Sequence, residues 1–218
     1  MNRATRTIVS TVGVILGVAG MNHGFFEALQ GSAPTGGLII QAIGPGQRMW
    51  VHGTEEAFTL VPNYLLTGVL AIVVSLVIMV WSVGFIHTRR GPTVFFLLFM
   101  LLFLVGGGIG QVLFFLPAWA ASRKINSPLE WWEKTLPPRW RKTLARVWPF
   151  TLVAGAVGFL MALWLAITGM LPGEMDVDTI LYTTWLILLA AWVLNLVSFV
   201  SGFAADLERG PLDTGGGP

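Results

Sequence analysis

Long apolar stretches separated by short polar segments dominate the order of residues along this chain. Each of five stretches is long enough to cross the hydrocarbon core of a membrane as a helix, which takes about 20 residues. These stretches occupy residues 7–26, 58–86, 93–119, 148–171 and 179–204. None shows the alternation of apolar and polar residues that is typical of a barrel strand. The pattern predicts an all-α, polytopic transmembrane helical bundle of about five spans that forms a single domain over residues 1–206.

The third stretch contains the glycine-rich run 106–110 in its middle, where a chain that enters and leaves on one side would need a turn. That re-entrant arrangement would place every Lys and Arg residue except Arg48 on one side of the membrane, as the positive-inside rule favours. However, residues 94–119 are too few for two full spans and suit one tilted helix. Five spans therefore remain the expectation, and the orientation of the chain stays open.

The segment between the third and fourth stretches, residues 120–147, combines basic and aromatic residues. Trp140, Leu144 and Trp148 recur at i, i+4 and i+8, while the basic residues occupy other positions. This pattern predicts a basic amphipathic helix that lies in the membrane interface and leads into the fourth span. The side chains expected to contact lipid headgroups, anionic ones in particular, are Arg139, Arg141, Lys142 and Arg146. Plain anchoring in the interface accounts for the same pattern.

Small residues mark helix faces that can approach one another closely. One face of the first stretch carries Gly13, Gly17, Gly20 and Gly24. The fourth and fifth stretches have similar faces of glycine, alanine and serine. Such faces allow tight helix packing in membranes, within one chain, in a homo-oligomer or against a partner membrane protein.

Composition supports membrane insertion and excludes some kinds of chemistry. Apolar residues make up 55% of the chain and charged residues 11%, and the mean hydropathy is +0.74. The absence of cysteine excludes disulfides, thiolate metal sites and thiol catalysis. The basic start followed by an apolar stretch is similar to a signal peptide, but its length favours an uncleaved first span. We expect a bacterial cytoplasmic (inner) membrane as the location and disorder in the tail 207–218.

Ionisable residues inside the first apolar stretch are the strongest indication of function. A charged side chain at the centre of a membrane helix costs at least about 2.5–3.5 kcal/mol, yet His23 and Glu27 lie one turn apart near the end of that stretch. A paired imidazole and carboxyl can take up and release a proton. The pair predicts binding or translocation of a small solute or ion, coupled to protons. The candidate residues for this site are His23, Glu27, Gln30, Asn63 and Gln111.

Two alternatives use the same region differently. Imidazoles and carboxylates bind zinc and other divalent metals, and such a metal can activate water in an intramembrane enzyme of the lipid-hydrolase kind. The ligands would be His23, Glu27, His52 and Glu56. Against this, Thr54, Glu55 and Glu56 also fit the capped first turn of the second helix. In the other alternative, the polar pair only holds the bundle together, and the chain is an accessory subunit of a membrane complex.

The absence of known catalytic and nucleotide-binding motifs excludes a few kinds of site but does not decide between these alternatives. The chain has no HExxH, GxxxxGK[ST] or GxSxG sequence, so no zinc-protease, nucleotide-binding or serine-hydrolase signature is present. Binding or translocation of a solute requires no cofactor, and a divalent metal belongs to the enzyme hypothesis alone. Membrane lipids are the expected partners, and nothing in the sequence indicates nucleic-acid binding.

Overall fold

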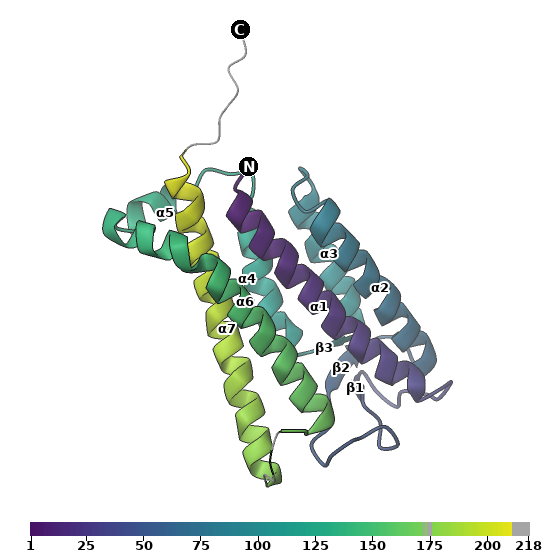
Figure 1. Ribbon diagram of the computed structural model, residues 1–218. Coiled ribbons are helices and arrows are strands. Elements are labelled where there is room, and N and C mark those ends of the chain that lie inside the picture. Colours follow the sequence, from purple (N-terminus) through teal and green to yellow (C-terminus); the bar gives the residue numbers. More distant parts are fainter. Residues whose placement is uncertain (172, 174–175, 211–218) are drawn as a thin grey trace.

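The computed structural model describes residues 1–171, 173 and 176–210, which form a mostly helical bundle (Figure 1). The helices in this part of the chain are α1 (Arg3–Leu29), α2 (Tyr64–Gly84), α3 (Gly91–Leu104), α4 (Gln111–Ser122), α5 (Glu130–Thr135), α6 (Pro138–Thr168) and α7 (Val177–Glu208). The strands are β1 (Ile39–Gln41), β2 (Glu56–Thr59) and β3 (Val105–Gly108). Among the described helices, four (α1, α2, α6 and α7) are long and apolar enough to cross a membrane. The predicted helical class is confirmed, and the count of five spans is not.

The third predicted span, residues 93–119, is divided into two short helices. α3 has 14 residues and α4 has 12, and the extended strand β3 lies between them. α3 runs toward the strands and α4 returns, so both helices have their outer ends beside the N-terminus (Figure 1). Several hydrogen bonds hold the chain at that end of the bundle, including the following two. The carbonyl of Ile125 accepts from the backbone N–H of Asn2 (2.7 Å), and the carbonyl of His87 accepts from the Asn126 side chain (2.6 Å).

Glycine explains why the helix breaks. Gly106 has a φ of +105°, a conformation that residues with a Cβ atom rarely adopt. From there the backbone runs extended and pairs with β2, where Ala57 lies opposite Gly108. The pairing gives the freed N–H and C=O groups partners, which backbone inside a membrane requires. The expectation of one tilted helix over residues 93–119 is therefore wrong.

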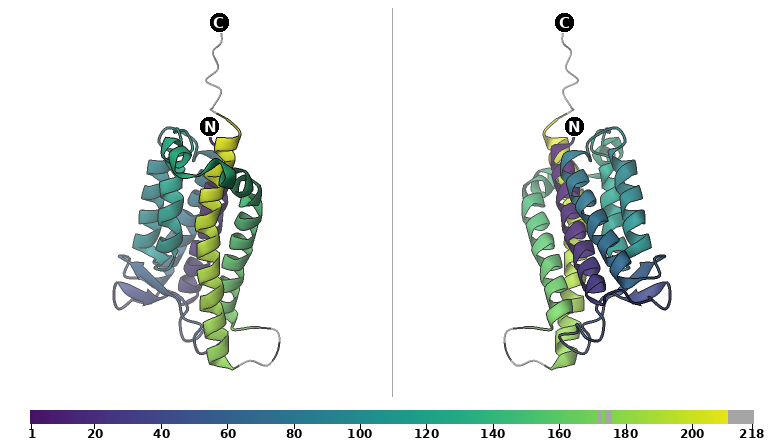
Figure 2. Two further views of the ribbon diagram at one scale, coloured as in Figure 1. Left: turned by 90° about the vertical axis from the view of Figure 1, so that its left-hand side faces the viewer. Right: turned by 90° about the vertical axis from the view of Figure 1, so that its right-hand side faces the viewer.

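A small antiparallel sheet closes the end of the bundle opposite the N-terminus (Figures 1 and 2). Its strand order is β1-β2-β3. The sequence pattern does not predict this sheet, so the all-α class is incomplete. Thr54 and Glu55 precede β2 rather than starting a helix. The second long helix begins later, at Tyr64, after the Asn63 side chain accepts a capping hydrogen bond from the N–H of Leu66 (3.1 Å).

The glycine face of α1 packs against α2 of the same chain. Gly24 and Gly68 lie at the closest approach, because a Cβ atom added to Gly68 would lie 2.5 Å from the Gly24 carbonyl oxygen. α6 and α7 also pack together but less closely, since a Cβ atom added to Gly158 would lie at an ordinary contact distance, 3.4 Å, from that of Ala191. The predicted close packing is confirmed. An oligomer formed through these two faces would have to displace α2 or α7.

The basic segment before the fourth span is part of a long continuous helix. α5 is short, and α6 runs from Pro138 through Pro149 to Thr168 without a break. Arg141 is half-buried, and its guanidinium donates to the carbonyl of Leu136 (2.8 Å) and to that of Glu133. The exposed residues of the predicted headgroup set are Arg139, Lys142 and Arg146. Of the predicted tail 207–218, α7 includes the first two residues, and 211–218 lie outside the described residues.

Two carboxylates cap the N-termini of helices by accepting hydrogen bonds from backbone N–H groups. Asp206 is buried near the end of α7 and accepts from the backbone N–H groups of Ala4 and Thr5 (2.9 Å each) and from the Thr5 hydroxyl (2.7 Å). It thereby caps the N-terminus of α1 from another helix. Asp176 caps α7, and donation by the hydroxyl and N–H of Thr179 lowers the pKa of this exposed carboxyl.

Candidate functional site

His23 and Glu27 lie near the far end of α1, against the extended backbone of β3. His23 is 6% exposed and Glu27 is completely buried. Since they are one helical turn apart, both project from the same side of α1. An imidazole and a carboxyl therefore lie one turn apart where the α3–α4 hairpin turns, and within the described residues no hydrogen bond or ion pair joins the two.

Two glycines of β3 provide the space for these side chains. A Cβ atom on Gly106 would collide with the Glu27 carboxyl group, and a Cβ atom on Gly108 would collide with the His23 imidazole. Gly106 also needs its freedom of φ, whereas Gly108 has no positive φ. The glycine run thus breaks the helix and lets its backbone contact the two polar side chains directly.

Glu55 joins the site from the loop before β2. Its Oε2 atom lies 3.5 Å from Nε2 of His23, and its side chain is 31% exposed. Three ionisable groups therefore follow one another from a partly exposed carboxyl, through an almost buried imidazole, to a buried carboxyl. The sequence pattern does not identify Glu55 as a site residue. Residues 54–56 fit the start of a helix, and His23, which Glu55 contacts, lies 32 positions away in the chain.

Several buried polar atoms of this site lack hydrogen bonds. Within the described part of the chain, Nδ1 of His23 and both carboxyl oxygens of Glu27 have no partner. Buried polar groups in folded proteins are nearly always paired, so unpaired ones call for a functional or solvent explanation. A small pocket beside His23 and Glu55, with room for about one water molecule, is lined also by Leu163 and Ile167 of α6.

The other candidates for solute binding do not join this group. The Gln30 side chain donates to the carbonyls of Gln41 (3.0 Å) and Ala42 (2.8 Å), which holds the loop before β2. Asn63 caps α2. Gln111 is buried at the start of α4, and within the described residues its Nε2 has no partner. It lines a separate small pocket between α3 and α4.

The four residues of the metal hypothesis are not gathered at one point. His52 packs against Trp50 in the loop, with ring centroids 5.4 Å apart. Glu56 is exposed on β2, whereas its neighbour Glu55 is the carboxylate that reaches His23. The residues that the structure describes contain no group of three or more His, Asp and Glu side chains placed to hold a metal ion.

Comparisons with protein-family models, with curated proteins and with solved structures gave no match for this chain. Function therefore has to be inferred from the chemistry of the site, since a helical bundle by itself does not specify one. The group formed by Glu55, His23 and Glu27 is the part of the molecule that supports such an inference.

Proposed function

We propose that this chain is an integral membrane protein that binds and translocates a small solute or ion, coupled to a proton, at His23 and Glu27. One observation carries this proposal. A buried carboxyl and imidazole, with polar atoms that no described residue satisfies, abut the glycine tip of a broken helix. Membrane transporters bind substrates near such interrupted helices, where extended backbone and ionisable side chains meet.

The arrangement of charges suggests how the bundle lies in the membrane. We place α1, α2, α6 and α7 as four spans and the α3–β3–α4 segment as a re-entrant hairpin. Every Lys and Arg residue except Arg48 then belongs to the end that carries the N-terminus. The positive-inside rule assigns that end to the cytoplasm. In the bacterial cytoplasmic membrane that we expect, Glu55 and the sheet would face outward.

The three ionisable groups provide a route for a proton. Glu55 is the group closest to water, His23 contacts it, and Glu27 lies deepest. An imidazole can accept a proton at one ring nitrogen and donate one from the other, so His23 can relay a proton between Glu55 and Glu27. A carboxylate charge without a partner is costly inside a membrane. We therefore expect Glu27 to be either protonated or paired with the positive charge of a bound solute.

Proton flux into liposomes that contain the purified protein tests this proposal. The vesicles enclose a pH-sensitive dye, and a potassium diffusion potential drives protons inward. We expect flux well above that of empty vesicles, and a loss of at least about tenfold in Glu27→Gln, since the amide keeps the shape and cannot release a proton. Asp178→Asn, an exposed acid in the first turn of α7, is the matched control and should retain full flux.

Two outcomes would contradict the proposal: wild-type flux no faster than that of empty vesicles, or wild-type flux in Glu27→Gln. Melting of each purified variant in detergent shows that it is folded. Flux or lipid hydrolysis that disappears with a chelator would instead support the metal-dependent alternative.

A further inference from the structure

The outer face of α6 changes from basic to apolar along its length. Arg139, Lys142 and Arg146 recur at i, i+3 and i+7, so they lie on one face of the helix, and all three are exposed. We call these three residues the basic stripe. The same face continues through exposed apolar residues, namely Phe150, Val153, Val157 and Trp164. Such a change is expected where a helix passes from the headgroup region into the hydrocarbon core.

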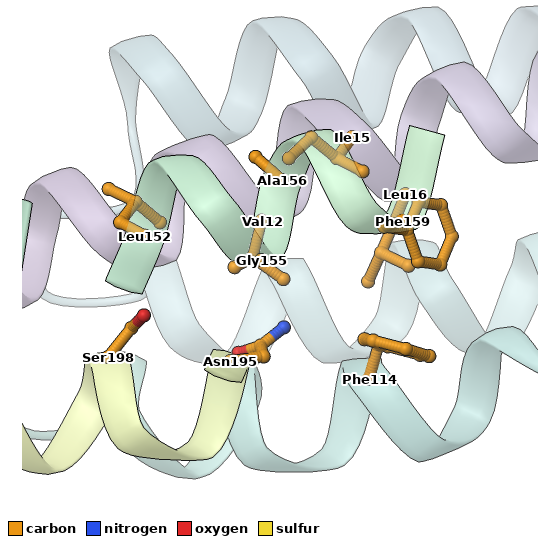
Figure 3. Close-up of a pocket in the computed structure, with 10 residues that line it drawn as sticks. All are labelled: Val12, Ile15, Leu16, Phe114, Leu152, Gly155, Ala156, Phe159, Asn195 and Ser198. Atoms are coloured by element: carbon orange, nitrogen blue, oxygen red, sulfur yellow. The ribbon is translucent and has the colours of Figure 1, made fainter. Parts of the chain in front are cut away.

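The opposite face of α6 packs into the bundle. Phe159 is 7% exposed and projects about 180° from Phe150 at 100° per residue. Together with side chains of α1, α4 and α7, it lines a small internal pocket (Figure 3). The other α6 residues in this pocket are Leu152, Gly155 and Ala156. The basic stripe and its apolar continuation therefore face away from the bundle, toward the surroundings of the protein.

The positive charges of the basic stripe are not neutralised within the described part of the chain. The sole ion pair there joins His23 and Glu55. The acids of the preceding helix α5, Glu130 and Glu133, thus lie more than 4 Å from all three basic groups. Three positive charges on one exposed face favour an anionic partner.

The position of the basic stripe at the start of a helix strengthens this preference. α6 begins at Pro138, and its first turn contains no acid but carries Arg139. The N-terminus of a helix bears a partial positive charge, which favours acids and disfavours basic residues. An anion bound at the basic stripe would offset this repulsion.

We propose that the basic stripe binds the phosphate of an anionic phospholipid, whose acyl chain lies along the apolar continuation of the stripe. This surface and the site of His23 and Glu27 lie at opposite ends of the bundle (Figure 1), so the inference does not depend on the transport proposal. A phosphate beside Lys142 would lie within about 6 Å of the other two residues along the helix axis. Arginine binds phosphate oxygens through paired hydrogen bonds, and lysine adds a further charge.

The apolar continuation favours a lipid over a soluble anion. Phe150 is 75% exposed and Val153 is 61% exposed. If the ligand were free phosphate, these side chains would stay uncovered beside it, whereas the acyl chain of a phospholipid covers them.

Thermal melting of the full chain in detergent, with lipid added, measures this binding. Phosphatidylglycerol has a net negative headgroup, phosphatidylcholine has the same phosphate beside a positive charge, and glycerol 3-phosphate has the phosphate without an acyl chain. We expect phosphatidylglycerol to give half-maximal stabilisation at a concentration at least about tenfold below that of the other two. Raising the salt concentration about tenfold should weaken phosphatidylglycerol binding at least about threefold.

Two triple variants locate the site on the protein. R139Q/K142Q/R146Q removes the basic stripe and should bring phosphatidylglycerol and phosphatidylcholine within about twofold of each other. The control removes the same charge by changing to glutamine three exposed arginines at the same end of the bundle, Arg3, Arg89 and Arg90. This control should keep the preference for phosphatidylglycerol.

A single substitution tests the contact with the acyl chain. Phe150→Ser should weaken phosphatidylglycerol binding at least about threefold. Tyr182→Ser removes a similarly exposed aromatic ring from α7 and should bind as the wild type does. Melting without added lipid shows that each variant is folded.

The proposal is overturned if the wild type does not prefer phosphatidylglycerol to phosphatidylcholine, which would indicate plain anchoring in the interface. It is also overturned if glycerol 3-phosphate binds as tightly as the lipid, if salt has no effect, or if the two triple variants bind alike. Equal binding by Phe150→Ser and Tyr182→Ser would refute the placement of the acyl chain along α6.

Discussion

At the scale of single residues, the site depends on two glycines, whose lack of a side chain leaves space for neighbouring groups. Gly106 and Gly108 leave room for Glu27 and His23, and a methyl group at either position would collide with them. His23 and Glu27 could be found from the sequence, because ionisable groups in an apolar stretch are costly and therefore informative. Glu55 could not, because its contact with His23 depends on how the intervening loop folds.

Gly108→Ala tests whether space at the hairpin tip matters. Gly108 has no positive φ, so the substitution adds a methyl group against the His23 imidazole without straining φ. We expect stability to fall by about 1–3 kcal/mol, the usual effect of overpacking, and proton flux to fall with it. Gly46→Ala is the matched control, since no described atom lies within 4 Å of its added Cβ. If Gly108→Ala and Gly46→Ala have equal melting temperatures and equal flux, the space that Gly108 leaves beside His23 is not needed.

Asp206→Ala tests the carboxylate that caps α1 from α7. Three donors, the N–H groups of Ala4 and Thr5 and the Thr5 hydroxyl, would lose their acceptor in a buried place. We expect a loss of about 1–3 kcal/mol in unfolding free energy, measured by denaturation in mixed micelles. Glu208→Gln, an exposed change two residues later, should have little effect. A stable Asp206→Ala protein would mean that water replaces the carboxylate.

At the scale of helices and strands, the sequence of one segment is compatible with two structures, and contacts with residues far away in the chain determine which one forms. The length of residues 93–119 favours one helix, whereas the glycine run favours a break. Pairing of β3 with β2, about fifty residues earlier, resolves this in favour of the break. The packing of α1 was easier to predict, because its four glycines form one face whatever the partner. That the partner is α2 became clear only from the structure.

Gly68→Val tests the close crossing of α1 and α2. A Cβ atom at Gly68 would lie 2.5 Å from both the Ala28 nitrogen and the Gly24 carbonyl oxygen, which are backbone atoms that cannot turn aside. The helices would have to separate, and we expect a loss of about 1–3 kcal/mol or more, measured by melting in detergent. Gly84→Val, in the same helix with no described atom within 4 Å, should melt within a few degrees of the wild type.

At the scale of the whole molecule, the distribution of basic residues and the connectivity of the helices favour the same topology. The α3–α4 hairpin returns the chain to the end where it entered, and this brings the basic residues before and after it to one side (Figure 2). The positive-inside rule already favours this arrangement from the sequence alone. The length of the apolar stretch favours the other arrangement, because helices of 14 and 12 residues are each too short to cross a membrane, whereas one tilted helix over the whole stretch would be long enough.

Single-cysteine labelling separates the two topologies. The natural chain has no cysteine, so each variant reports one position. Thr88 precedes the hairpin and Thr135 follows it, while Ser32 lies in the loop at the sheet end. With a re-entrant hairpin, Thr88→Cys and Thr135→Cys share one side, and in intact cells an impermeant maleimide should label only Ser32→Cys. Five full spans would instead put positions 88 and 135 on opposite sides, so labelling of one without the other would refute the hairpin whichever way the protein is oriented.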